Sequence, residues 1–366
     1  MDTKNSIDKQ SPVPLYYQLK EFFRQQITHE YKPGEKFLSE REIARKYSVS
    51  RVTASRVMND LLHENYLIRI QGKGTFINDF KRPKTWNIGY LISPRLITFA
   101  EQTHTEADAK QLVVIHDICW KNGYNLVFFM SKDVLSNRKY LDSIVKKVDG
   151  LIISGDIDES LIAYLHNLIP VVLLDYYVEG EEYSSVMADN VDGAYKIVSH
   201  LLDLGHERIG HIYGPLISPS FRERLAGYRK ALLARDIQPE EELVVEGGGI
   251  IEDGLRAMNK LLSLENPPTA VFAGNDIMAM GALKSLKERK IKVPEDISIA
   301  GFDANVSLYY NDLPLTSVDP NISAMAQAAI TMLFDKIENN LTQNKNKKIV
   351  VPVKIVYGKS CARNKK

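Results

Sequence analysis

The sequence predicts an α/β protein with a small, mainly helical N-terminal domain and a larger C-terminal domain built on parallel sheets. Apolar side chains recur at helical spacing over residues 14–62, and two short β-prone runs joined by a glycine-containing turn follow them. From residue 86 onward, short apolar runs alternate with amphipathic stretches, which is typical of parallel sheets with helices on both faces. The length of 366 residues also exceeds one compact core.

Two helices are predicted at the start of the N-terminal domain. The first begins after Pro14 and ends before Pro33-Gly34. Proline is favoured at the start of a helix, whereas a later proline ends it. Its core positions are Leu19, Phe22, Phe23 and Ile27. The second is short and begins at Ser39, where Glu42 three residues later forms a capping-box pattern.

A third helix is predicted to begin at Ser50, a good N-cap residue. Its buried stripe would be Ala54, Val57, Met58, Leu61 and Leu62. Its exposed start carries hydroxyl side chains and an arginine, at Ser50, Arg51, Thr53 and Ser55. Hydroxyls and backbone N–H groups can contact phosphates, and a guanidinium can contact guanine edges in the major groove. The second and third helices therefore predict a helix-turn-helix that binds DNA.

A β-hairpin is predicted behind these helices, with strands over residues 67–70 and 75–77. The connecting turn is Gln71-Gly72-Lys73-Gly74. Its glycines permit positive φ, which lets the backbone and Lys73 approach a phosphate or the minor groove closely. This hairpin would be the wing of a winged helix-turn-helix.

Over residues 14–77 the sequence resembles the GntR, or gluconate-repressor type, family of DNA-binding domains. The matching strings are P-L-Y-Y-Q-L, P-G-E-K-F-L-S-E-R-E-I-A, S-V-S-R-V-T and Q-G-K-G-T-F-I. The resemblance implies that DNA is contacted by Arg41, Ser50, Arg51, Thr53, Gly72 and Lys73. The family usually has a second arginine where this chain has Ser55. Ser55 remains a candidate DNA contact. Arg56 lies one position later, about 100° further around the helix, so we do not expect it to substitute.

The distribution of charge agrees with a domain that faces phosphates. Residues 1–78 hold 13 basic and 9 acidic side chains, whereas the rest of the chain holds 34 basic and 37 acidic ones. A charged stretch over residues 79–85, containing Lys81-Arg82-Pro83-Lys84, predicts a linker. The expected domains are therefore a DNA-binding domain over residues 1–78 and a ligand-binding and dimerisation domain over residues 86–366.

Composition excludes several classes of protein. No run approaches about 20 apolar residues, and the polar N-terminus is not a secretion signal, so we expect a cytoplasmic protein that makes no membrane contact. The two cysteines, Cys119 and Cys361, predict neither a disulfide framework nor a zinc site.

The C-terminal domain is predicted to consist of two lobes with a ligand cleft between them. Its apolar runs cover residues 87–92, 125–130, 150–154, 171–175, 209–213, 270–274 and 297–302. Ligands of open α/β sheets bind outside the carboxyl ends of the strands, so the polar residues after these runs are candidates. They are Ser93, Ser154, Asp175, Asp189, Asn190, Asn275, Asp276 and Asp303.

The residue types in this set favour a monosaccharide as the ligand. Carboxylates and amides can bond pairs of sugar hydroxyls, each of which both donates and accepts. The sequence contains no nucleophile elbow, phosphate-binding loop or zinc-binding helix motif, so we expect a protein that is not an enzyme. We expect no cofactor and no metal, and we expect structural roles for His200, His206 and His211.

From residue 87 to about 360 the chain resembles the effector-binding half of LacI/GalR repressors, which has a type I periplasmic-binding-protein fold. The matching strings include V-D-G-L-I-I-S, A-D-N-V-D-G-A, F-R-E-R-L-A-G-Y, A-V-F-A-G-N-D-I-M-A-M-G-A-L and V-P-E-D-I-S-I-A-G-F-D. The resemblance implies that the effector is bound by Ser93, Asp175, Arg222, Asn275 and Asp303. Asp189 and Asn190 are expected to organise the crossover between the lobes. Arg224 is expected to brace the hinge or a neighbouring helix, and Asp276 to cap a helix.

An aromatic ring often stacks on the sugar in this fold, commonly from the loop that here reads Gly247-Gly248-Gly249-Ile250-Ile251. Because that loop has no aromatic residue, Phe99, Phe221 and Phe302 are the alternatives. A GntR-type head joined to a LacI-type domain resembles the arabinose-responsive repressors. This implies a sugar-responsive repressor of carbohydrate uptake or catabolism genes, with an arabinose-like pentose or a deoxyhexose as effector.

Such a repressor would bind a palindromic operator as a homodimer and release it when the sugar binds. An activator with the same architecture and a sugar-binding transport protein are the alternatives. A regulator derived from an aminotransferase would require a pyridoxal-binding lysine in a far longer chain. The apolar helix predicted over residues 322–337 belongs either to a lobe core or to the dimer face.

Overall fold

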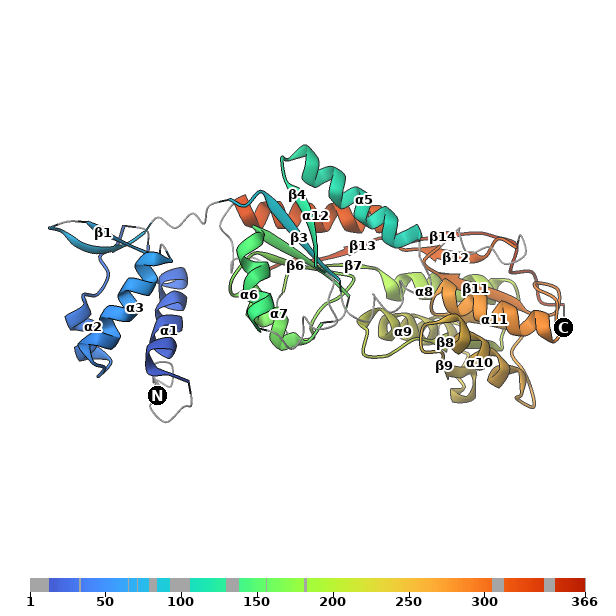
Figure 1. Cartoon of the computed structure of the whole chain (residues 1–366). Helices are drawn as coiled ribbons and strands as arrows, with labels where there is room; N and C mark the ends of the chain where they lie inside the picture. The colour runs from blue at the N-terminus through green and yellow to red at the C-terminus, as the bar shows by residue number, and fades with distance from the viewer. Residues whose placement is uncertain are drawn as a thin grey trace. The chain divides into compact units, whose positions relative to one another are not determined.

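The chain divides into two compact units, Met1–Lys84 and Thr85–Lys366, and the division falls within segment 79–85. The computed structural model describes residues 13–32, 34–64, 66–70, 72–78, 84–92, 106–129, 138–155, 157–180, 183–304, 313–338 and 346–365 (Figure 1). Ser93 and Phe99, both named as ligand candidates from the sequence, lie outside these residues.

The first unit is a winged helix-turn-helix, as predicted. It consists of α1 (Leu15–His29), α2 (Glu40–Lys46), α3 (Arg51–His63), β1 (Leu67–Ile70) and β2 (Gly74–Ile77). The strands form an antiparallel hairpin in which Leu67 pairs with Ile77. Three helices and the hairpin share one core, whose fully buried members are Leu19, Phe23, Ile43, Ala54, Val57 and Leu61.

Local signals in the sequence fix where α2 and α3 begin. The Ser39 backbone N–H donates to the Glu42 carboxylate at 2.7 Å, and the Glu42 backbone N–H donates to the Ser39 hydroxyl at 3.3 Å, which completes the predicted capping box. The Ser50 hydroxyl accepts from the Thr53 backbone N–H at 3.0 Å. The two caps hold the start of α3 in a defined position on the domain surface.

The second unit contains two six-stranded sheets, with strand orders β13-β7-β6-β5-β3-β4 and β14-β12-β11-β10-β8-β9. The first sheet consists of β3 (Asn87–Ile92), β4 (Asn125–Phe129), β5 (Gly150–Ser154), β6 (Val171–Leu174), β7 (Ser185–Ala188) and β13 (Lys348–Val351). The second consists of β8 (Ile209–Tyr213), β9 (Val244–Glu246), β10 (Ala270–Ala273), β11 (Ser298–Phe302), β12 (Thr316–Asp319) and β14 (Lys354–Val356). The described strand pairs are parallel except β12 with β14, so the predicted parallel sheets are confirmed and one antiparallel edge is added.

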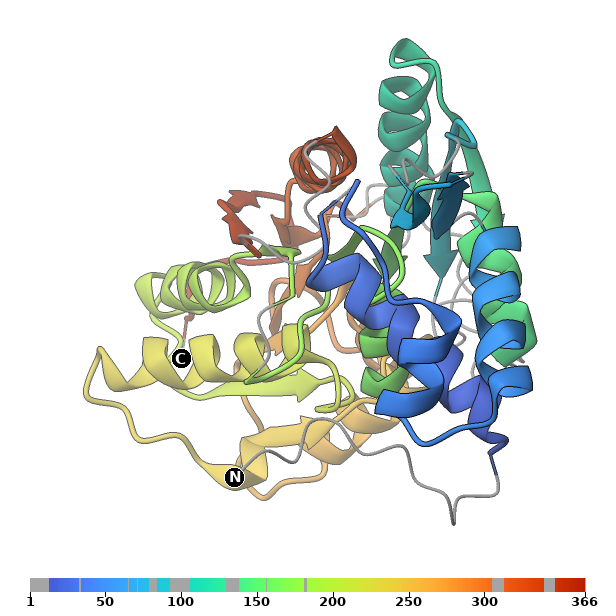
Figure 2. The ribbon, with the colours of Figure 1, turned by 90° about the vertical axis from the view of Figure 1, so that its left-hand side faces the viewer.

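Helices cover both faces of each sheet. They are α5 (Glu106–Lys121), α6 (Arg138–Lys147), α7 (Glu159–His166), α8 (Asn190–Asp203), α9 (Pro219–Leu233), α10 (Ile251–Leu262), α11 (Asp276–Glu288) and α12 (Ile322–Glu338), with a short 3₁₀ turn, η1, at Glu241–Leu243. In the first lobe, α5 and α12 pack on one face and α6 and α7 on the other (Figure 1). In the second lobe, α8 and α9 lie side by side (Figure 2), and α10 and α11 cover the opposite face.

The chain passes between the lobes at three places: from β7 to α8 at Asp189, from β12 to α12, and from β13 to β14 through Pro352-Val353. The apolar face of α12 is buried in the core of the first lobe, where Met325, Ala326, Ala329 and Ile330 are at most 3% exposed. The structure therefore places this helix in a lobe core, one of the two alternatives left open by the sequence.

Candidate DNA-binding and effector-binding sites

The start of α3 presents the predicted DNA contacts at the surface of the first unit. Ser50 and Arg51 are exposed, and Thr53 and Ser55 are half-buried. Among the described residues, the Arg51 guanidinium has no hydrogen bond or ion pair, so it is available to a ligand. The Ser50 and Thr53 hydroxyls lie 2.8 Å apart, and each keeps bonding capacity toward solvent.

A basic groove of about 860 Å³ runs beside this helix start. Its basic lining residues are Lys36, Arg41, Arg45, Arg51 and Arg69. Its acidic residues, Glu40 and Glu42, are engaged within the domain: Glu40 pairs with Arg69 at 3.3 Å, and Glu42 belongs to the capping box. The groove is therefore positive overall. Lys36 and Arg69 were not predicted as contacts, because their proximity to Arg41 arises from the fold. Arg45 was not predicted either, although it lies one turn after Arg41 on α2.

The hairpin turn has the backbone that its glycines were expected to supply. Gly72 and Gly74 have φ of +75° and +117°, and the Lys73 backbone N–H donates to the Ile70 carbonyl at 3.0 Å. Gly72 and Lys73 are both exposed. The wing tip can thus approach a phosphate closely.

Arg56 is bound within the domain and does not replace the arginine that Ser55 lacks. Its guanidinium lies 3.9 Å from the centre of the Tyr16 ring on α1, a cation–π contact. This contact ties α3 to α1, in agreement with the expectation that Arg56 points away from Ser55.

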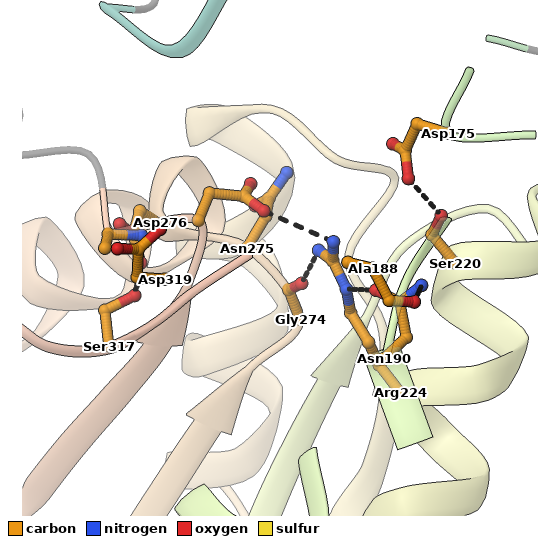
Figure 3. Close-up of polar contacts among 12 residues, drawn as sticks. Asp175, Ala188, Asn190, Ser220, Arg224, Gly274, Asn275, Asp276, Ser317 and Asp319 are labelled. Atoms are coloured by element: carbon orange, nitrogen blue, oxygen red, sulfur yellow. Dashed lines mark hydrogen bonds and ion pairs between the residues drawn. The ribbon is translucent and has the colours of Figure 1, made fainter. Parts of the chain in front are cut away.

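In the second unit, Arg224 on α9 is the centre of a polar cluster at the carboxyl ends of the strands (Figure 3). Its guanidinium donates to the Asn190 side-chain oxygen at 2.9 Å and to the Gly274 carbonyl at 2.6 Å. It also pairs with the Asp303 carboxylate at 3.2 Å and lies 3.7 Å from the centre of the Phe302 ring. Arg224 is 5% exposed. Arg224 therefore holds neighbouring groups in place, as expected. The groups that it holds are Asn190, the Gly274 carbonyl and Asp303, at the centre of the candidate ligand site.

Two of the predicted effector carboxylates have unusual backbones. Asp175, directly after β6, has φ of +56°, and Asp303, directly after β11, has φ of +106°. Left-handed backbone is unfavourable for residues with a side chain, and such strain concentrates at functional sites. The Ser220 hydroxyl donates to Asp175 at 3.2 Å, and the side chain of Asp303 is 31% exposed. Asp175 is half-buried, so both carboxylates are partly accessible at the strand ends.

The structure gives the helix-capping role expected of Asp276 to Asn275. Asn275 caps α11, because its side-chain oxygen accepts from the Met278 backbone N–H at 2.8 Å, and its amide N–H donates to the Gly249 carbonyl at 3.2 Å. Asp276 is the first helical residue and is 1% exposed, so the expectation that it caps the helix is wrong. Its carboxylate accepts from the Ser317 hydroxyl at 2.6 Å. Asp189, in contrast, caps α8 at the crossover between lobes.

Arg222 lies apart from this cluster. Its guanidinium donates to the carbonyls of Leu216 and Ile217 at 2.6 and 2.9 Å and pairs with Glu179 at 2.8 Å. These contacts fasten the loop before α9. Of the two arginines in F-R-E-R-L-A-G, the structure brings Arg224, and not Arg222, together with Asn190 and Asp303.

Two of the three candidate aromatic rings, Phe221 and Phe302, belong to the described residues. Phe302 is completely buried beneath the Arg224 guanidinium, so it cannot stack on a ligand. Phe221 is half-buried at the start of α9, and its ring packs against the backbone of Gly214, where a Cβ would lie 2.4 Å from the ring. Gly214 follows β8, so Phe221 lies at the same edge of the sheet as Asp303.

The buried histidines are held by contacts of the fold. His206 lies 3.0 Å from the hydroxyls of Thr269 and Ser298. His211 is fully buried, stacks between Tyr228 and Phe272, and bonds the Phe272 carbonyl at 2.9 Å. Burial lowers the pKa of His211 to about 4. Within the described residues no group of three or more histidine, cysteine or acidic side chains is placed to hold a metal ion.

Comparison with known proteins gives a match for each unit. Residues 15–77 match the family of bacterial regulatory proteins of the gntR type, and residues 198–361 match the periplasmic binding protein-like domain. The HTH-type transcriptional repressor PurR of Escherichia coli O139:H28 (strain E24377A / ETEC) is 30% identical over 322 residues, covering 82% of this chain and 90% of that protein.

Solved structures show the same fold. A complex of the transcriptional regulator CelR with cellobiose has a TM-score of 0.69 at 22% identity, covering 88% of this chain and 100% of that one. The lac repressor dimer bound to operator and the anti-inducer ONPF has a TM-score of 0.64 at 26% identity, and the match covers 77% of this chain and 96% of that one.

A winged helix-turn-helix with a basic groove, joined to a two-lobed domain with polar strand ends, defines a DNA-binding transcriptional regulator with a ligand-binding domain. The chain belongs to the LacI-type family of regulators that includes PurR, and it carries a GntR-type DNA-binding domain in that architecture. The predicted resemblances to both families are confirmed. No helix in the described part of the chain is long and apolar enough to span a membrane.

Proposed function

We propose that this protein is a cytoplasmic repressor that binds a palindromic operator and releases it when a small neutral sugar enters the cleft of the second unit. The cluster around Arg224 is the observation that carries the effector half of the proposal. Asn190 and Asp303 place an amide and a carboxylate around one buried guanidinium, and Asp175 supplies a second carboxylate directly after β6, where the Ser220 hydroxyl donates to it. Such a set suits a ligand with several hydroxyl groups, because each hydroxyl can both donate and accept.

The residues that we propose to bind the effector are Ser93, Asp175, Arg224, Asn275 and Asp303, with the Phe221 ring against the apolar face of the sugar. Arg222 is retained only as a support of the neighbouring loop. The strand ends carry several carboxylates, which favours an uncharged sugar over a sugar phosphate. An arabinose-like pentose or a deoxyhexose is our preferred effector. Genes for carbohydrate uptake or catabolism are the proposed targets.

On the DNA side, we propose contacts from Arg41, Ser50, Arg51, Thr53, Ser55, Gly72 and Lys73, extended by the other basic residues of the groove. The groove supplies cations for phosphates, and the exposed Arg51 supplies a fork-shaped donor for a guanine edge. The relative PurR is named a repressor, which supports repression over activation.

A homodimer is the proposed form on DNA. The first lobe exposes apolar side chains on α5 and on the edge strand β4: Val113 is 58% exposed, Trp120 is 72% exposed and Phe128 is 45% exposed. Val113 and Trp120 are seven residues apart, so they share one helix face. A second copy would cover this face, and a two-fold dimer would match a palindromic operator. The lac repressor relative is described as a dimer on its operator, which supports this arrangement.

Coupling between sugar and DNA would follow thermodynamic linkage. If the sugar favours one arrangement of the lobes and DNA another, each ligand lowers affinity for the other by the same factor, typically about 5- to 150-fold. A thermal-shift screen against pentoses, deoxyhexoses, hexoses and their phosphates should identify a sugar that raises the Tm. The same sugar should weaken binding to an operator selected from a random duplex library.

Two variants separate the halves of the proposal. Arg51→Ala should weaken operator binding and leave the sugar-induced Tm shift intact. Asp303→Asn should abolish the Tm shift and leave operator binding intact but unresponsive to sugar. Loss of both functions in both variants would refute the division of roles, and absence of any sugar response would refute the proposed effector class.

A further inference from the structure

Val52 is the most exposed large apolar side chain in the described part of the chain. It is the second residue of α3 and is 80% exposed. The buried stripe of α3 is Ala54, Val57, Met58 and Leu61. At about 100° per residue, Val52 lies about 180° from the centre of that stripe. The side chain therefore points directly away from the core of its domain.

The stability of the helix gives no reason for a valine at this position. A β-branched residue has a lower helix propensity than alanine, lysine or glutamate, and an exposed valine gains nothing from burial. Val52 is not among the side chains packed on the core of the first unit. A polar residue would be at least as favourable for the folded domain.

The surroundings of Val52 are polar and unoccupied by other parts of the described fold. Arg51 precedes it with a free, exposed guanidinium, and Thr53 follows it with a hydroxyl bonded to Ser50. One turn later on the same face, Arg56 is held on the Tyr16 ring and leaves the first turn open. Val52 is thus an isolated apolar side chain in the first turn of α3, between the polar residues Arg51 and Thr53.

Base edges in the major groove present one apolar group, the C5 methyl of thymine. We propose that Val52 contacts the C5 methyl of one thymine in each half-site and so specifies an A·T pair at that position. This inference rests on the proposed operator binding through the start of α3. The neighbouring Arg51 and Thr53 would hold the helix on the DNA by polar contacts. Val52 would distinguish the A·T pair from other base pairs at a position where no hydrogen bond from the protein does so.

Deoxyuridine provides a direct test, because it differs from thymidine only by the missing C5 methyl. Full-length protein is first used to enrich binding duplexes from a random library. Each thymine of one half-site is then replaced in turn by deoxyuridine, and the Kd is measured at constant salt. For the wild-type protein we expect about a fourfold loss of affinity at one thymine, the factor for removing one methyl from an apolar contact.

The Val52→Ala variant should bind the thymine duplex more weakly and show no further loss with deoxyuridine at that same position. Val52→Thr, which keeps the shape of the side chain but replaces a methyl by a hydroxyl, should also lose most of the discrimination. Val350→Ala is the matched control, because Val350 is 48% exposed on β13 in the other unit. It should keep the full fourfold effect.

The outcomes distinguish this inference from the function on which it rests. If the library yields no preferred sequence, operator recognition itself fails. If a sequence is selected but no deoxyuridine weakens binding, or if Val52→Ala retains the same penalty as the wild type, the assignment of Val52 is refuted. Circular dichroism of each variant checks that α3 is still folded.

Discussion

Arg222 and Arg224 show how two identical side chains acquire different roles within three residues. Arg224 lies three, four and seven residues before Gly227, Tyr228 and Ala231, all buried, so it belongs to the buried stripe of α9. Arg222 lies about 200° away around the helix and points outward. The sequence contained this signal, because the phase of the apolar stripe distinguishes the two arginines where motif spacing alone did not.

We expect Arg224→Lys to impair both stability and effector binding. An ammonium cannot replace the planar fork that joins Asn190, the Gly274 carbonyl and Asp303, and it would leave buried acceptors unsatisfied at a cost of about 1–3 kcal/mol. Arg222→Lys is the matched control, with a loss of less than about 1 kcal/mol because its ion pair is exposed. Chemical denaturation and sugar titration measure the two effects. Similar losses in both variants would contradict the central position of Arg224.

His211 makes the second unit sensitive to acid. Burial lowers its pKa to about 4, whereas the pKa in an unfolded chain is about 6.5. Between these values the unfolded state binds more protons than the folded state, so the free energy of unfolding decreases as pH falls through this range. Burial also lowers the pKa of His166, His200 and His206, which adds to the same trend.

The contribution of His211 can be isolated by His211→Asn. The variant should be less stable at neutral pH but should lose less stability between pH 6.5 and 4, by an amount on the order of 3 kcal/mol. His116→Asn is the control, since His116 is exposed on α5 and its side chain is 61% accessible. Denaturation curves across this pH range provide the measurement. Parallel pH profiles of wild type and His211→Asn would exclude the assignment.

At the scale of elements, the long apolar runs predicted strands well, and the short ones did not. β3, β5 and β8 were expected with the bounds that the structure gives. β7, β12, β13 and β14 were missed, and each of them has only three or four residues. Neighbouring strands on the same sheet determine their conformation, and tertiary context of this kind is not local in sequence. Asp175 and Asp303 were found because they directly follow the well-patterned strands β6 and β11.

The packing of α10 on α11 depends on glycine. A Cβ at Gly281 would lie 2.0 Å from the Ile251 carbonyl oxygen, so Gly281→Ala would push the two helices apart. Overpacking costs about 1–3 kcal/mol, whereas the gain in helix propensity is at most about 1 kcal/mol. Net destabilisation is therefore expected in denaturant titrations. Lys284→Ala, an alanine on the exposed side of α11, should change stability by less than about 0.5 kcal/mol, and equal effects would argue against close packing.

At the scale of the whole molecule, two compact units with separate cores should unfold as two units. The first core belongs to α1–α3 and the hairpin, and the cores of the second unit share no residue with it. Calorimetry of the full chain should show two transitions. A sugar at 100 times its Kd should stabilise only the transition of the second unit, by about 2.7 kcal/mol. A single transition that shifts as a whole would reveal strong coupling between the units.

During synthesis of the chain, β13 and β14 are the last strands that the two sheets receive. Both follow every other described strand, yet β13 forms an edge of the first sheet and β14 an edge of the second. The first sheet is incomplete until β13 has left the ribosome and the second until β14 has, whereas the first unit needs only residues before 85. On a nascent chain, the part that contacts DNA is therefore finished while both lobes of the ligand-binding part still have an open edge.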